Sequence, residues 1–227
     1  AGLSLKTGNA VILRGGSEAI RSNQAIADCI LRAGIAAGMP EGTVQFIPWT
    51  AHEAVSEMLK LDSFINLIIP RGERLIRAVV EQSTIPVIKH YKGVCHLYVD
   101  SEADQEMALN ILRNGKCQRP GVCNALETVL VNRKIAAEFL PKLEKMFCKE
   151  GVTVHADDAW RKLDPAAVPG TEEELYNEYL SLNISGRIVD SVEQAVEHIN
   201  QYGSGHSDCI VTGNPETAEY FLGHVDS

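Results

Sequence analysis

The feature of this sequence that most constrains its fold is an alternation of short apolar runs with amphipathic segments, repeated about every 25 residues. In the first half, apolar runs predict strands at residues 9–14, 43–47, 64–69, 85–89 and 94–99. Helical periodicity, with a capping box at Thr50, predicts helices at residues 22–38, 50–59, 73–82 and 102–113. Strands that alternate with helices are joined by right-handed crossovers, so the sequence predicts an α/β fold with a parallel sheet.

The same alternation resumes after Asn114 and Gly115, which end the last of these helices. Further strands are predicted at residues 128–131, 152–155 and 208–212, and further helices at residues 135–147 and 214–225. Capping boxes at Thr171 and Ser191 predict two more helix starts. The break at Asn114 predicts a domain boundary, which gives two α/β domains at residues 1–114 and 115–227.

Composition restricts the functions open to the chain. It has 227 residues, 45% of them hydrophobic, and a net charge of −9. An acidic chain is not expected to bind nucleic acid or an acidic membrane surface, and no apolar run reaches the roughly 18 residues that cross a membrane. Six cysteines and seven histidines are dispersed without metal-ligand spacing. This pattern predicts reduced thiols in the cytoplasm and no bound metal.

One cysteine stands out within the stretch QRPGVCNALETVLV, residues 118–131. Pro120 and Gly121 favour a tight turn, and the apolar run that follows predicts a buried strand. Cys123 lies at the junction of turn and strand, where a thiol can face a cleft. Two interpretations stay open from the residues alone: a nucleophile, or the small buried hydrophobe that most free cysteines are.

Two glycine-containing turns follow predicted strands of the first half. Arg14 is followed by Gly15, Gly16 and Ser17, and a second turn contains Pro70, Arg71 and Gly72. Ligands of open parallel sheets bind at the carboxyl ends of the strands, so both turns are predicted phosphate or ribose loops. The first turn lacks the full GxGxxG pattern, and a plain strand-to-helix turn remains the alternative.

Several segments together resemble the γ-glutamyl phosphate reductase family of the aldehyde dehydrogenase superfamily. Besides the cysteine stretch, they are LKTGNAVILRGGSEA, IPRG, IPVIKHYKGVCHLYVD, TEEELYNEYL and YGSGHSDCIVT, in the family's order. The resemblance covers essentially the whole chain. It implies part of a parallel-sheet NADP-binding domain at residues 1–114, followed by an α/β catalytic domain at residues 115–227. It also implies that the chain is an internal fragment of such an enzyme.

The resemblance implies an activity and assigns roles to residues of the second domain. The activity is NADPH-dependent reduction of γ-glutamyl phosphate to glutamate 5-semialdehyde, with phosphate release, in proline biosynthesis. Cys123 would form a thioester, and the backbone N–H groups of Cys123 and Asn124 would donate to the oxyanion. Arg119 would activate the thiol or hold substrate phosphate, although a surface charge explains it equally well. His206 and Ser207 would approach the substrate, with a structural loop histidine as the alternative.

The resemblance also assigns the cofactor-binding residues. Arg14, with the turn at Gly15, Gly16 and Ser17, would hold the 2′-phosphate of NADPH. Arg71 and Gly72 would approach the pyrophosphate, but Glu73 replaces a second glycine that the family usually has. Glu178 would hold the nicotinamide ribose, and a solvated helix-end acid is its alternative.

The residues leave other activities open. An oxidising or CoA-acylating aldehyde dehydrogenase has the same fold, and a non-catalytic fragment is the alternative outside enzymes. Hydrolytic aldehyde dehydrogenases carry a glutamate where this sequence aligns His90 or Tyr91, which predicts slow hydrolysis of the thioester unless His90 acts as the base. Assembly into a homo-oligomer and coupling to glutamate 5-kinase stay open.

Overall fold

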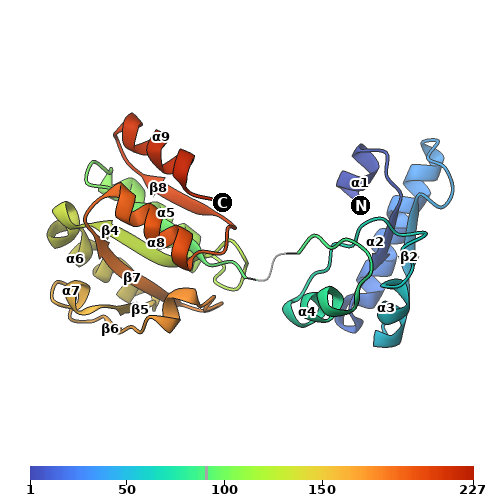
Figure 1. The fold of residues 1–227 in the computed structure, drawn as a ribbon, viewed down its shortest axis with the longest axis horizontal. Helices are drawn as coiled ribbons and strands as arrows, with labels where there is room; N and C mark the ends of the chain where they lie inside the picture. The colour runs from blue at the N-terminus through green and yellow to red at the C-terminus, as the bar shows by residue number, and fades with distance from the viewer. Residues whose placement is uncertain (90–91) are drawn as a thin grey trace. The chain divides into compact units, whose positions relative to one another are not determined.

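The structure, a computed structural model, describes residues 1–89 and 92–227. The chain divides into two compact units, Ala1–Lys89 and residues 90–227 (Figure 1). The sequence placed the boundary after residue 114 instead. The difference arises because strand β3 (Cys95–Val99) pairs with strands from later in the chain, so that it and the helix after it belong to the second unit.

The first unit is built around two short parallel strands, β1 (Val11–Arg14) and β2 (Val44–Ile47). Its helices are α1 (Gly2–Lys6), the 3₁₀ turn η1 (Ser17–Ala19), α2 (Ile20–Ala36), α3 (His52–Met58) and α4 (Glu73–Gln82). The capping box expected at Thr50 is not formed, because α3 begins after Ala51 without a side-chain cap.

Two strands expected in the first unit do not form. The runs at residues 64–69 and 85–89 meet only in a single parallel bridge between Ile68 and Val87. Pro86 and Pro70 lie beside the bridge, and proline cannot donate a ladder hydrogen bond. Hydrophobicity therefore predicted the pairing partners but not the length of the pairing.

The second unit contains a six-stranded parallel sheet in the order β6-β5-β7-β4-β3-β8. Its strands besides β3 are β4 (Leu126–Asn132), β5 (Thr153–Ala156), β6 (Val168–Pro169), β7 (Asn183–Val189) and β8 (Asp208–Val211). Every residue of β4 is buried, as expected for a strand covered on both faces. The predicted α/β fold with a parallel sheet is confirmed.

Helices cover both faces of this sheet (Figure 1). They are α5 (Gln105–Cys117), α6 (Arg133–Glu150), α7 (Asp158–Arg161), the 3₁₀ turn η2 (Glu173–Tyr176), α8 (Val192–Tyr202) and α9 (Pro215–His224). Leu97 and Val99 pack in one apolar cluster with residues of α5 and α6. Tyr98, which alternates with them, packs in the other cluster with α8 and α9.

Strand β7, one of the two central strands of the sheet, is the longest of several elements that the sequence did not predict. Its sequence NISGRIV is interrupted by Gly186 and Arg187, which mask the apolar run. A Cβ at position 186 would lie 3.0 Å from Val154 and 3.1 Å from the ring of Trp160. The glycine therefore allows Trp160 to pack closely on the strand.

His198 of α8 makes the stability of the second unit depend on pH. Its ring lies 5.5 Å from that of His96, and its buried Nε2 has no hydrogen-bond partner among the described residues. Burial lowers the pKa of His198 from 6.5 to about 3. Below pH 6.5 the unfolded chain therefore binds a proton that the folded chain does not, so stability decreases as the pH falls from 6.5 towards 3.

We expect the free energy of unfolding to fall by about 2 kcal/mol between pH 7.5 and pH 5 through this residue alone. His198→Phe keeps a packed ring but cannot titrate, so it should remove that part of the pH dependence. His224→Phe, at an exposed position on α9, is the control. Unfolding at both pH values tests this, and an unchanged pH dependence in His198→Phe would refute it.

Candidate active site

The candidate site of the second unit lies at the edge where its strands begin. Cys123 lies just before β4, His206 and Ser207 just before β8, and Glu178 in the segment that leads into β7. Strands β7, β4, β3 and β8 are neighbours and all parallel, so the segments that precede them meet at one edge. The fold thus brings these separate sequence segments to the amino edge of the sheet.

Cys123 is exposed in a turn between α5 and β4. The carbonyl of Arg119 accepts the N–H of Val122 (3.4 Å), and the carbonyl of Val122 accepts the N–H of Ala125 (3.0 Å). Neither the N–H of Cys123 nor that of Asn124 donates to another described residue. The interpretation of Cys123 as a buried hydrophobe is therefore wrong, and two adjacent N–H groups remain available to a ligand.

The backbone of Cys123 rests on the segment that leads into β3. A Cβ at position 93 would lie 1.7 Å from the carbonyl oxygen of Cys123, so only glycine fits there. The thiol of Cys95 donates to the same carbonyl oxygen (3.4 Å). Burial, followed by the charge of Asp208, raises the pKa of Cys95 to about 12, which keeps this thiol protonated as a donor.

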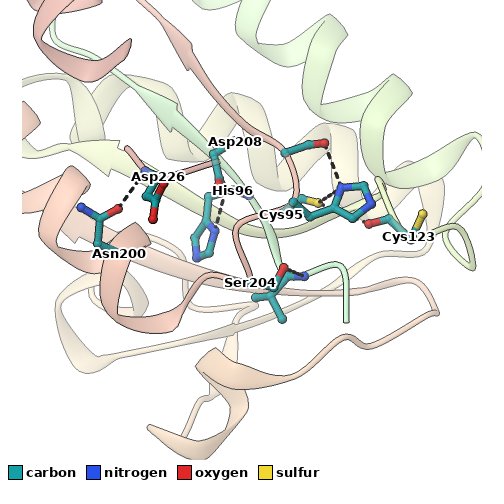
Figure 2. Close-up of polar contacts among 10 residues, drawn as sticks. Cys95, His96, Cys123, Asn200, Ser204, Asp208 and Asp226 are labelled. Atoms are coloured by element: carbon teal, nitrogen blue, oxygen red, sulfur yellow. Dashed lines mark hydrogen bonds and ion pairs between the residues drawn. The ribbon is translucent and has the colours of Figure 1, made fainter. Parts of the chain in front are cut away.

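Figure 2 shows the carbonyl oxygen of Cys123 turned towards Cys95 and its sulfur turned away. Gly93 and Cys95 thus contact the turn at the carbonyl oxygen of Cys123 and leave the Cys123 thiol exposed. Neither residue was predicted from the sequence to contact the turn. The only signal was a glycine just before the buried run at residues 94–99, which does not reveal a contact with a distant turn.

His206 contacts Cys95, which in turn contacts the carbonyl oxygen of Cys123. Its Nδ1 lies 3.8 Å from the sulfur of Cys95 and 2.9 Å from the hydroxyl oxygen of Ser207. The neighbouring Asp208 accepts the backbone N–H of His96 (2.8 Å) and contacts its Nδ1 (2.9 Å), with both side chains buried (Figure 2). These contacts hold the start of β8 against β3.

A cavity of about 620 Å³ opens between α5 and strands β3 and β8. Asn124 and Ser207, both predicted site residues, contribute to its lining. Asn110 and Asn114 of α5 also line it and were not predicted, because exposed asparagines on a helix give no distinctive pattern. Arg119 is exposed, and Glu178 is half-buried between η2 and β7.

In the first unit, Arg14 ends β1 beside the chain that follows β2. Its Nη2 donates to the carbonyl oxygens of Thr50 (2.6 Å) and Ala51 (3.5 Å). Its Nε is buried without a hydrogen-bond partner among the described residues. Gly15, Gly16 and Ser17 follow directly, and η1 begins at Ser17. This turn lies at the carboxyl ends of two parallel strands, as predicted.

The second turn of the first unit precedes α4. Gly72 has a φ of +95°, in the region that favours glycine, and Arg71 beside it is exposed. His90 and Tyr91, which the sequence analysis aligned with the hydrolytic glutamate, lie outside the described residues.

No group of three or more His, Cys, Asp or Glu side chains in the described part of the chain is placed to hold a metal ion. Among the same residues, no helix is both long and apolar enough to cross a membrane.

Comparison with known proteins assigns the chain to a family. The sequence model of the aldehyde dehydrogenase family matches residues 1–162, well over half of the chain. The chain therefore belongs to the aldehyde dehydrogenase family, and the fold and family imply a nicotinamide cofactor. A propionaldehyde dehydrogenase from Clostridium phytofermentans shares the fold, with a TM-score of 0.72 and 19% identity over 97% of this chain and 59% of that chain.

Within this family, the relatives most informative about this chain are γ-glutamyl phosphate reductases. Those of Moorella thermoacetica and Citrifermentans bemidjiense are 52% and 51% identical to it, over 100% of this chain and 54% of their own length. The crystal structure of the Thermotoga maritima enzyme of that name matches with a TM-score of 0.89 and 42% identity, over 99% of this chain and 55% of that chain. The resemblance stated from the motifs is confirmed, and the chain spans about half the length of the curated relatives it matches.

Proposed function

We propose that this chain belongs to an enzyme that reduces γ-glutamyl phosphate to glutamate 5-semialdehyde and phosphate, the activity that gives its relatives their name. The observation that carries the proposal is the exposed Cys123, presented at the amino edge of the sheet in a chain about half identical, over its whole length, to these reductases. The product is an intermediate of proline biosynthesis. We place the enzyme in the cytoplasm, where unpaired cysteines stay reduced.

The chemistry begins at the Cys123 sulfur. The thiolate attacks the acyl carbon of γ-glutamyl phosphate, the carbon–oxygen bond to phosphate breaks, and inorganic phosphate leaves with the bonding electrons. The thioester on Cys123 is then reduced by hydride, which bound NADPH supplies. Hydride addition would leave the acyl carbon bearing an alkoxide, whose oxygen re-forms the carbonyl as the carbon–sulfur bond breaks, so that glutamate 5-semialdehyde and the Cys123 thiolate would be released.

The surroundings of Cys123 support these steps. The available N–H groups of Cys123 and Asn124 would donate to the oxyanion that forms when sulfur attacks the acyl carbon. Arg119, exposed at the start of the same turn, would attract the substrate phosphate. Ser207 and Asn124 line the same cavity, so Ser207 would contact the substrate, and His206 would act next to it. The substrate is a labile acyl phosphate made by glutamate 5-kinase, which favours functional coupling between the two enzymes.

The residues of the first unit fit the cofactor proposed for them. A buried Nε without a hydrogen-bond partner among the described residues leaves the half-buried Arg14 with unused hydrogen-bonding capacity at the carboxyl ends of β1 and β2. Arg14 and the turn at Gly15, Gly16 and Ser17 would hold the 2′-phosphate, which distinguishes NADPH from NADH. Arg71 and Gly72 would approach the pyrophosphate, and Glu178 of the second unit would hold the nicotinamide ribose.

Replacing Arg14 should discriminate between the two cofactors. A charge-assisted contact to phosphate is worth about 1.5–3 kcal/mol, so Arg14→Ala should weaken NADPH binding roughly ten- to a hundredfold and barely change NADH binding. Arg32→Ala, at an exposed position of α2, is the matched control. Calorimetric titration with each cofactor measures both affinities. Equal losses for NADPH and NADH would show that Arg14 supports the fold rather than the 2′-phosphate.

The acceptor of the acyl group tests the proposed activity against its alternatives. The full-length enzyme is given glutamate 5-semialdehyde and NADP⁺, with phosphate, with coenzyme A, or with neither. The proposal expects NADPH formation to require phosphate. Sustained formation with coenzyme A alone would indicate a CoA-acylating enzyme, and sustained formation with neither would indicate a hydrolytic one.

A further inference from the structure

A fully buried ion pair joins helix α5 to strand β4, the two elements that flank the turn containing Cys123. Lys116, near the end of α5, donates from Nζ to Oε2 of Glu127 in β4 at 2.6 Å, and neither side chain has any exposed surface. Helix and strand approach closely here, as a Cβ built at Gly115 shows: it would lie only 2.8 Å from the side chain of Leu126. The pair therefore connects the two elements that begin and end the turn containing Cys123.

The second oxygen of Glu127 binds a segment from another part of the sequence. Oε1 accepts the backbone N–H of Leu180 (3.3 Å), and the backbone N–H groups of Leu180 and Tyr179 both act to lower the pKa of this carboxyl group. Lys116 Nζ lies 5.9 Å from the centre of the Tyr179 ring. One buried carboxylate thus holds both a lysine of α5 and the chain that leads into β7.

Stability alone does not account for this pair. Burial raises the pKa of Glu127 and lowers the pKa of Lys116, because each charge is removed from water. Well-packed apolar residues of similar volume often stabilise a protein as well as a buried ion pair does. What they cannot supply is an acceptor for the N–H of Leu180, which points to a role in placing this segment.

The segment that Glu127 holds has an unusual backbone. Leu180 has a φ of +53°, a left-handed conformation that L-residues rarely adopt and that persists only when surrounding contacts enforce it. A Cβ at Gly121 would lie 3.8 Å from the carbonyl oxygen of Leu180, so the segment also packs against the turn before Cys123. Glu178 is two residues before Leu180 in the same segment, so contacts that fix Leu180 restrict where Glu178 can lie.

We infer that Lys116 and Glu127 form a brace that fixes the Glu178 segment against the cysteine turn, so that Glu127 is a positioning residue for cofactor use. The inference rests on the proposed function, because Glu178 matters to catalysis only as the group that holds the nicotinamide ribose. The brace links the cysteine turn to the Glu178 segment through the Glu127 side chain, whose Oε2 accepts from Lys116 and whose Oε1 accepts the Leu180 N–H. Both side chains are fully buried, so neither touches substrate.

Two double variants of the full-length enzyme separate the hydrogen bond from the charges. Lys116→Met with Glu127→Leu removes both charges and the acceptor for Leu180. Lys116→Met with Glu127→Gln removes the same charges but keeps an amide oxygen that can accept from the Leu180 N–H. Single variants that leave one buried charge unpaired are avoided because they endanger folding. Glu138→Gln with Lys142→Met, an exposed pair on α6, is the control.

The readouts are amide hydrogen exchange over residues 176–182 and steady-state kinetics with varied NADPH. In the Met/Leu variant we expect faster exchange of the Leu180 amide and a kcat/KM for NADPH that is roughly 10- to 100-fold lower. We expect KM for γ-glutamyl phosphate to change much less. The Met/Gln variant should restore most of both losses, and exchange within β4 should stay slow in both.

Each other result decides against the inference or against its premise. Unchanged Leu180 exchange in the Met/Leu variant would show that there is no brace, and faster exchange with wild-type cofactor kinetics would show that the brace positions nothing needed. Equal losses in both double variants would assign the effect to the buried charges and would contradict positioning through the hydrogen bond to Leu180. If a double variant does not fold, Glu127→Asp is measured instead. It keeps the negative charge but shortens the side chain, so it should weaken the hydrogen bond to the Leu180 N–H, and the same two readouts apply. A wild-type enzyme without phosphate-dependent activity would refute the proposed function, while the exchange comparison would still decide whether the brace exists.

Discussion

Cys123→Ala is expected to lower the reduction of γ-glutamyl phosphate by several orders of magnitude, on the order of 10⁴-fold or more, as expected when a covalent nucleophile is removed. Without the sulfur no thioester can form, although the contacts of Gly93 and Cys95 with the carbonyl oxygen of residue 123 are kept. Because Cys123 is exposed, alanine leaves no buried cavity, and the fold should be unaffected. Steady-state rates and thermal unfolding of the variant measure the two effects separately.

Cys148→Ala is the matched control, because Cys148 is also an exposed free cysteine but lies on α6. It should retain wild-type activity. A Cys123→Ala enzyme with near wild-type rates would remove the proposed nucleophile. Equal losses in the two variants would show that activity depends on thiol content rather than on this position.

Gly93→Ala is expected to have the second-largest effect, although residue 93 carries no functional group. The new methyl carbon would start 1.7 Å from the carbonyl oxygen of Cys123, and the backbone of the turn must move by more than an ångström to relieve the overlap. A displacement of that size in a reacting group can cost about 100-fold in rate. Overpacking of this kind also costs about 1–3 kcal/mol in the free energy of unfolding.

Gly223→Ala provides the comparison within the same unit. No heavy atom lies within 4 Å of a Cβ at Gly223, which lies in helix α9, so alanine there should be neutral or stabilising. The kcat of both variants, measured beside their unfolding curves, tests the expectation. A Gly93→Ala enzyme with wild-type kcat would mean that the turn tolerates displacement and that its position is not critical.

The sequence predicted the class of fold because apolar periodicity determines which segments are buried. Helix α4 was predicted with the bounds observed, and strand β4 within a few residues. Strand β7 was not predicted, because Gly186, which allows Trp160 to pack on the strand, interrupts the apolar pattern. The extent of pairing at residues 64–69 and 85–89 was overestimated, since two prolines limit a ladder that hydrophobicity alone would extend.

The candidate site was predictable where motifs carry the chemistry and not where tertiary contacts do. The turn at Cys123 could be predicted from Pro120 and Gly121. The buried pair of Lys116 and Glu127 could not, because lysine and glutamate are almost always exposed and no local pattern indicates otherwise. The contact of Gly93 with Cys123 likewise joins segments that only the sheet brings together.

The measurement that tests the central claim most directly is a single-turnover experiment on the full-length enzyme with glutamate 5-semialdehyde and NADP⁺ in the absence of phosphate. Hydride transfer from the thiohemiacetal leaves a thioester that only phosphate should release. The account predicts a burst of about one NADPH per active site, a γ-glutamyl adduct located on Cys123 by peptide mass spectrometry, and turnover that resumes when phosphate is added. Continued NADPH formation without phosphate, or an adduct on any residue other than Cys123, would contradict it.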